Sequence, residues 1–144
     1  LSETAKEIAA PFESLAIMQE KVFKCDFGSD VLLNGDTSLI GQLINILLDN
    51  AFKYSDEGGS VTLRIGADGK CRSITVTNTS DKIDTDHLDK LFDRFYRSDK
   101  SRNSETGGFG IGLSVAKSIV HLHKGKITAQ SPDGKQMIFT VTFS

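Results

Sequence analysis

Apolar residues recur at helical spacing in the first part of the chain. Residues 2–21, "SETAKEIAAPFESLAIMQEK", predict an amphipathic helix with Ile8, Phe12, Leu15 and Met18 on one face. We expect Ser2 to be the N-cap of this helix. Pro11 should kink or restart the helix, because proline has no backbone N–H to donate.

Two further segments have the same helical pattern. The stronger one is "TSLIGQLINILLDNAFKY", residues 37–54, and Asp36 directly before it is a suitable N-cap. The other runs from about Leu113 to Leu122. Three helices are therefore expected.

Short runs rich in β-branched residues alternate with these helices and predict strands. "VFKCDF" and "VLLN" flank a turn at "GSD", and "VTLRIGA" and "CRSITVTN" form a hairpin about Asp68 and Gly69. "KITAQS" and "MIFTVTF" are joined by Pro132, Asp133 and Gly134. This order of elements predicts an α+β sandwich in which three helices cover one face of a mixed sheet.

Composition and charge limit the possible partners. With 144 residues, 38% hydrophobic and 25% charged, the chain has the size and composition of one globular domain, residues 1–144. Its net charge of −2 gives no general attraction to nucleic acid or to an anionic membrane, so neither is expected as a partner. Cys25 and Cys71 are isolated and predict reduced thiols, which suits the cytoplasm. No signal peptide and no membrane helix are expected.

A glycine-rich stretch precedes the last predicted helix. In "ETGGFGIGL", residues 105–113, Gly108, Gly110 and Gly112 allow several backbone N–H groups to face one anion, and the helix dipole adds partial positive charge. Phosphate is the natural ligand of such a turn. The alternative is a flexible loop that simply ends at a helix. The stretch lacks the Lys-Ser or Lys-Thr pair of a P-loop and the preceding strand of a Rossmann unit.

The central predicted helix carries a second candidate group. Ile46, Asn50, Lys53 and Tyr54 form one stripe at the border of its apolar face. The Asn50 carbonyl can bind Mg²⁺, Lys53 can reach a phosphate, and Tyr54 offers an aromatic surface to a base. Alternatively, this is an ordinary amphipathic helix with solvated polar residues.

Three motifs taken together point to one family. "LINILLDNAFKYS", "LFDRFYRSD" and "GGFGIGL", in this order, resemble the N, F and G2 boxes of the catalytic and ATP-binding domain of bacterial sensor histidine kinases. The resemblance extends from about residue 12 to 143, within the gyrase, kinase and mismatch-repair ATPase superfamily. It implies a Bergerat-type two-layer α/β sandwich with a sheet of about five strands. The nucleotide would lie between the Asn50 helix and a mobile ATP lid, roughly residues 80–110.

The resemblance also assigns roles to individual positions. It implies ATP and Mg²⁺ as cofactors, with Asn50 binding the metal, Lys53 a phosphate and Tyr54 lying beside the adenine. Phe92 and Phe95 would anchor the lid, and Arg97 would reach the phosphates. The matching G2 positions are Gly108, Gly110, Gly112 and Leu113.

Two motifs depart from the family pattern. The G1 box, Asp-x-Gly-x-Gly in the family, here reads Asn78, Thr79, Ser80, Asp81 and Lys82, with Ile83 kept. We expect the Asn78 carbonyl to accept a hydrogen bond from the adenine amino group without the charge assistance of Asp, so ATP should bind about tenfold more weakly. Ile46 replaces the first asparagine of the N box, and the neighbouring Asn45 points about 100° away.

In this family the γ-phosphate passes to a histidine on a separate dimerising helical-hairpin domain. The three histidines, His87, His121 and His123, lack the expected His-Glu/Asp-Leu context. The chain is therefore interpreted as a fragment whose residues 1–11 connect to that domain. A response regulator would act downstream, and the parent protein would be anchored in the cytoplasmic membrane.

Two alternatives remain open. The altered G1 box is compatible with a nucleotide-binding pseudokinase that serves as an interaction module. The second alternative is another member of the superfamily, such as an anti-sigma serine kinase or a gyrase-type ATPase. Arg97 in the F box and the lack of a catalytic Glu near Asn50 disfavour the gyrase type.

Overall fold

The fold was obtained as a computed structural model that describes residues 1–28, 31, 33, 35–80, 112–132 and 134–143. In these residues three helices and five strands follow one another along the chain. They are α1 (Ser2–Met18), β1 (Val22–Asp26), α2 (Thr37–Tyr54), β2 (Ser60–Asp68), β3 (Cys71–Thr79), α3 (Gly112–Leu122), β4 (Lys126–Gln130) and β5 (Gln136–Phe143).

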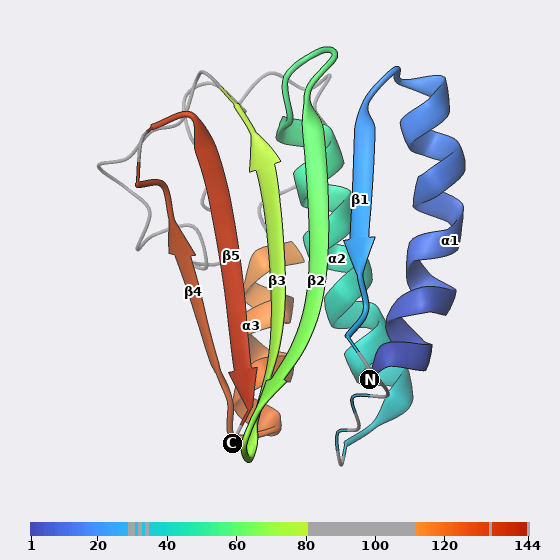
Figure 1. Cartoon of the computed structure of the whole chain (residues 1–144). Coiled ribbons are helices and arrows are strands. Elements are labelled where there is room, and N and C mark those ends of the chain that lie inside the picture. Colours follow the sequence, from blue (N-terminus) through green and yellow to red (C-terminus); the bar gives the residue numbers. More distant parts are fainter. Residues whose placement is uncertain (29–30, 32, 34, 81–111, 133, 144) are drawn as a thin grey trace.

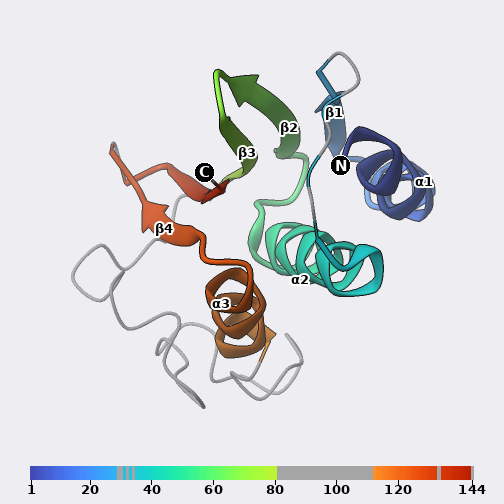
Figure 2. The same ribbon diagram turned by 90° about the horizontal axis from the view of Figure 1, so that it is seen from below.

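The five strands form one mixed sheet in the order β1-β2-β3-β5-β4. β1 pairs with β2 in parallel, and the other neighbours pair antiparallel. All three helices lie on one face of this sheet (Figures 1 and 2). The predicted α+β sandwich is therefore confirmed, including the mixed sheet.

The core lies between the sheet and the helix layer. Alternate residues of the central strands point toward the helices and are buried: Val61, Leu63, Ile65, Ile74, Val76, Phe139, Val141 and Phe143. From α2, Leu43, Ile44, Leu47 and Leu48 are fully buried against them. The opposite face of the sheet is largely polar and includes paired threonines, with Thr62 opposite Thr77 and Thr75 opposite Thr140. Helices thus cover the only face of the described sheet that is strongly apolar.

Two local predictions are confirmed by backbone geometry. The Asp36 side chain accepts a hydrogen bond from Leu39 N at 3.1 Å and caps α2. The β2–β3 hairpin turns through Gly69, whose φ of +61° is the left-handed conformation that glycine adopts without strain.

Two predictions at the N-terminal end are wrong. Ser2 is not the N-cap: it is the first residue of α1, it is 3% exposed, and Leu1 precedes it as the cap position. Its hydroxyl donates to Phe27 O at 2.7 Å and accepts from Val31 N at 2.9 Å. Residues 31–34 were expected to form a strand, but Val31 and Leu33 lie in none. The Val31 backbone bonds to Ser2 instead, since Ser2 N also donates to Val31 O at 3.1 Å.

Pro11 does not divide the first helix in two, because α1 is continuous across it. Proline removes the donor that would bond to the carbonyl four residues earlier, at Glu7. Both Glu7 and Pro11 are exposed, so water can hydrate that carbonyl.

Within the described residues, no helix combines the length and the apolar character that crossing a membrane would require.

Replacing Ser2 by alanine tests the bond between α1 and the loop at Val31. We expect Ser2→Ala to lower the free energy of unfolding by about 1 to 3 kcal/mol, because it leaves the buried Val31 N–H without its acceptor. Urea denaturation measures this change. Ser118→Ala is the control, since the Ser118 hydroxyl is exposed and bonds only within α3, to Ser114 O. Equal stability of both variants would contradict the assignment.

Candidate functional site

The predicted stripe of α2 lies at the border of the core. Ile46, Asn50 and Tyr54 are half-buried, whereas Lys53 is exposed. Full burial of Leu47 and Ala51 on the adjacent side fixes the rotation of the helix. The stripe therefore presents an amide, an ammonium and a phenol side chain along the edge of the helix layer.

Lys53 has an ion-pair partner in this arrangement. Its Nζ lies 3.0 Å from Asp49 Oδ2, one helical turn earlier. The Lys53 side chain is 39% exposed and the Asp49 side chain is 50% exposed. An exposed pair of this kind contributes little to stability. The Lys53 ammonium can thus change partner at small energetic cost.

The start of α3 lies beside the same stripe. A Cβ placed on Gly112, the first residue of α3, would come 3.7 Å from Ile46 Cγ2. Leu113 follows and packs, half-buried, against the core. The structure therefore brings one predicted G2 position, Gly112, to α2 and packs a second, Leu113, against the core.

Asn78 is a buried polar residue at the end of β3. It is 2% exposed and shares the helix-facing side of the strand with Ile74 and Val76. Its Nδ2 donates to Thr79 O at 3.3 Å. That bond uses the amide nitrogen and not the carbonyl Oδ1. Burial of an amide among apolar residues carries a desolvation cost, so its presence in this position is a signal of function.

Thr79 connects the end of β3 to the turn that follows α2. Thr79 O accepts from Asp56 N at 3.1 Å, and Thr79 Oγ1 accepts from Ser60 N at 3.0 Å. A Cβ on Gly59 would overlap Thr79 Oγ1, so glycine is needed for this close approach. The sequence analysis placed Thr79 in the G1 segment but missed this role, which depends on contacts between residues far apart in sequence.

Several predicted positions lie outside the described residues. These are Ile83 and Arg97, the F-box Phe92 and Phe95, the glycines Gly108 and Gly110, His87, and most of the expected lid, residues 80–110. Their roles stay predictions. In the described part of the chain, no group of three or more His, Cys, Asp or Glu residues is arranged to hold a metal.

The two cysteines are free thiols, in agreement with the prediction. Burial, with a smaller contribution from the nearby Glu13 carboxylate, raises the pKa of Cys25 to about 11. A thiol with so high a pKa is a poor nucleophile and metal ligand near neutral pH. Cys25 is therefore not among the candidate residues of the site.

The chain resembles known proteins in sequence. Residues 35–144 match the family described as histidine kinase-, DNA gyrase B-, and HSP90-like ATPase. The sensor protein CiaH of Streptococcus pneumoniae is 38% identical over 130 residues, covering 90% of this chain and 29% of CiaH. The signal transduction histidine-protein kinase BaeS of Escherichia coli is 42% identical over 101 residues, covering 69% of this chain and 22% of BaeS. The chain spans less than a third of these relatives.

Solved structures share the fold. The catalytic domain of histidine kinase ThkA superposes with a TM-score of 0.86 at 21% identity, covering 99% of this chain and 91% of that chain. The mycobacterial sensor histidine kinase MprB gives a TM-score of 0.80 at 24% identity, covering 98% and 93%.

Sheet order, helix layer and family match together define an ATPase domain with the α/β sandwich of histidine kinase catalytic domains. The chain belongs to the histidine kinase-, DNA gyrase B-, and HSP90-like ATPase family, as an ATPase domain of the sensor histidine kinase type. The family predicted from the three motifs is confirmed.

Breaking the Asp49–Lys53 pair tests whether Lys53 is available to a phosphate. We expect Asp49→Asn to change the free energy of unfolding by less than about 0.5 kcal/mol, because the pair is exposed. Titration with a non-hydrolysable ATP analogue should give an affinity about two- to fivefold higher, since a competing carboxylate is removed. Glu3→Gln, which breaks the exposed Lys6–Glu3 pair on α1, is the control. Weaker binding by Asp49→Asn would contradict a phosphate role for Lys53.

Proposed function

We propose that this domain binds ATP with Mg²⁺ and transfers the γ-phosphate to a histidine on a separate helical-hairpin domain. One observation carries the proposal: a buried amide at the end of β3, a polar stripe on α2 and the glycine start of α3 belong to one connected region. In a domain of this family, these groups suit the base, the metal with the phosphates, and the phosphate loop, respectively.

The donor set fits a nucleotide-bound Mg²⁺. This ion usually keeps several waters and takes only one or two protein oxygens together with phosphate oxygens. The half-buried Asn50 offers one such oxygen, and Ile46 offers none. When bound, Mg²⁺ would neutralise charge that develops on the phosphates.

In phosphoryl transfer the protein mainly positions the reacting groups and stabilises the charge of the transition state. The bond between the γ-phosphorus and the β–γ bridging oxygen breaks, ADP leaves, and a bond forms between phosphorus and the acceptor imidazole nitrogen. Lys53 would hold a phosphate oxygen through its ammonium, and Tyr54 would lie beside the base. Arg97 and the glycines Gly108, Gly110 and Gly112 are proposed to act on the phosphates, and Leu113 and Ile83 beside the base.

Adenine selection is proposed for Asn78. Its Oδ1 can accept from the exocyclic amino group while Nδ2 keeps its bond to Thr79 O. The flanking Ile74 and Val76 are buried on the same side of β3, so this acceptor lies in apolar surroundings. There the hydrogen bond discriminates well, because a base without the amino group would leave the acceptor unpaired.

The partners follow from the same family relation. We propose that residues 1–144 form one domain, that residues 1–11 lead to the phosphoacceptor domain of the same protein, and that a response regulator receives the phosphate. ThkA has been solved in complex with a response regulator protein. Residues 2–10 belong to α1, where Ala5 and Ala9 pack in the core. Membrane anchoring of the parent protein, with this domain in the cytoplasm, is part of the proposal. The comparisons give no support to the pseudokinase alternative.

Calorimetric titration with Mg²⁺ and a non-hydrolysable ATP analogue tests the proposed function. The wild-type domain should release heat and gain melting temperature, and Asn50→Ala should lose the Mg²⁺-dependent part of the affinity. Asn45→Ala is the matched control, because Asn45 is an exposed asparagine of the same helix outside the stripe. No heat and no change in melting temperature at millimolar nucleotide would refute ATP binding.

Two substitutions at Asn78 test adenine recognition. Asn78→Asp keeps an acceptor and adds charge, so ATP should bind up to about 1 to 2 kcal/mol more tightly. Asn78→Leu removes the acceptor and should cost about 1 to 3 kcal/mol of binding free energy, with loss of preference for ATP over GTP. Affinities for both nucleotides are measured on variants that keep the wild-type circular dichroism spectrum. If both folded variants bind ATP and GTP as wild type does, Asn78 does not read the base.

A further inference from the structure

Lys21 reaches from the turn between α1 and β1 to the end of α2. Its Nζ donates to Phe52 O at 2.8 Å and lies 3.4 Å from Ser55 O, a second acceptor. The backbone of Lys21 is itself fixed, because Lys21 N donates to Ala16 O at 2.9 Å. A side chain from outside the helix therefore binds the carbonyl end of α2.

The end of α2 needs such a partner. The last carbonyls of a helix have no donors within the helix and carry partial negative charge. The C-cap residue, Ser55, has extended backbone, so the glycine-type cap that would satisfy these carbonyls is not formed. Ser55 N bonds to Ala51 O and Ser55 Oγ to Phe52 O. Among the described residues, Lys21 is the positively charged side chain that donates a hydrogen bond to a carbonyl at this end of α2.

The Lys21 side chain is partly buried from solvent. Burial lowers the pKa of Lys21, and the Asp56 carboxylate offsets part of this effect. A hydrogen bond from an ammonium is stronger where water competes less. The contact is thus a fixed support of the helix end and differs from the exposed pair of Lys53 with Asp49.

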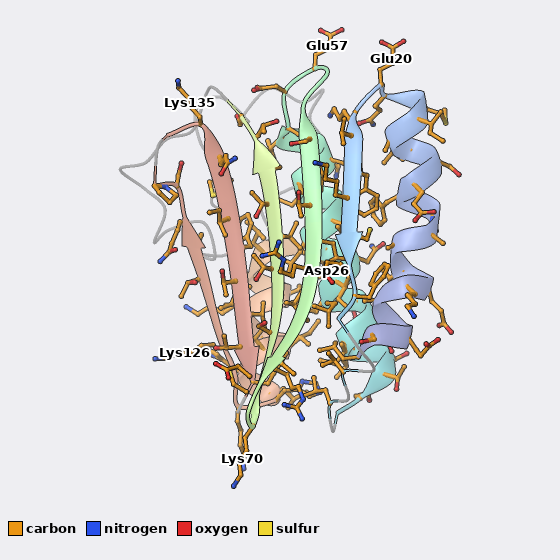
Figure 3. All side chains as sticks on the ribbon, viewed as in Figure 1. Glu20, Asp26, Glu57, Lys70, Lys126 and Lys135 are labelled. Carbon is orange, nitrogen blue, oxygen red and sulfur yellow. The ribbon has the colours of Figure 1, made fainter. Side chains whose placement is uncertain are left out.

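The α1–β1 turn that carries Lys21 is also hydrogen-bonded to the turn between α2 and β2. Val22 N, next to Lys21, donates to Gly59 O at 3.0 Å, and the turn at 56–59 is bonded to Thr79 through Asp56 N. Thr79 O is also the acceptor of the Asn78 amide. Figure 3 shows Glu20 and Glu57, which mark the α1–β1 and α2–β2 turns, at one end of the molecule. Lys21 therefore acts where the polar residues of α2 and the end of β3 are joined.

We propose that Lys21 is a positioning residue for the nucleotide site. By binding the carbonyl end of α2 it sets the place of Lys53 and Tyr54, which directly follow Phe52 in the last helical turn. This role rests on the proposed function. Lys21 is not expected to touch the nucleotide.

Three variants separate positioning from simple stabilisation. Lys21→Met removes the donors and charge but keeps a long side chain, and we expect it to weaken binding of the ATP analogue about three- to tenfold. Lys21→Arg keeps charge and donors and should return the affinity to within about twofold of wild type. Lys24→Met removes the same charge from the exposed position 24 of β1 and should bind as wild type does.

The dissociation constants are measured well below each melting temperature, so that loss of folded protein does not contribute. Backbone amide NMR shifts of Lys53 and Tyr54 in the free protein should change in Lys21→Met and be restored in Lys21→Arg. If Lys21→Met does not fold, Lys21→Gln, which keeps a shorter donor, replaces it with an expected loss in the same direction.

Unchanged affinity in a folded Lys21→Met or Lys21→Gln variant, while wild type binds, would overturn the positioning role and leave the proposed function intact. An equal loss in Lys24→Met would also overturn it, because general charge would then explain the effect. Failure of wild type itself to bind the analogue would overturn the proposed function and this role with it.

Discussion

Burial of one helix against the central strands controls the rest of this domain. The apolar side of α2 contributes Leu43, Ile44 and Leu47, which are shielded completely from solvent by the sheet and the flanking helices. Each such side chain stabilises the fold by about 1.5 to 3 kcal/mol relative to exposure. Rotating the helix by a single residue would expose this surface. The stripe with Asn50 is therefore held at the border of the core by the hydrophobic effect.

The ends of α2 are fixed by polar contacts from distant parts of the chain. At its start, Asp36 caps the helix and Asp36 N donates to His123 Nε2 at 3.2 Å, just beyond the end of α3. At its other end lie Lys21 and the turn bonded to Thr79. Apolar packing sets the rotation of the helix, and these polar contacts set its position along the axis. A site that binds a phosphate and a base at once needs both.

Local patterns were enough to predict most elements of the fold. The helix at residues 37–54, its cap at Asp36 and the hairpin at Gly69 depend on residues close in sequence, and each was predicted correctly. Ser2 was assigned wrongly because its hydroxyl bonds to Phe27 and Val31, which no local rule reveals. The same limit explains why Lys21 was missed. For the candidate site, motif spacing identified Asn50 and Asn78, but only the structure shows Asn78 buried and Gly112 beside Ile46.

Parallel pairing of β1 with β2 makes some contacts of the sheet far less local in sequence than others. Antiparallel β2 and β3 are joined by a two-residue turn, and a hairpin of this kind closes in about 1 to 10 μs. β1 can join this hairpin only after the chain has crossed over through α2, since parallel neighbours need a long connection. β5 pairs with β3 across a long stretch of sequence, so that Phe139 comes to lie opposite Val76. Because loop closure costs entropy before such contacts form, the central hairpin can serve as the surface on which both halves of the sheet are completed.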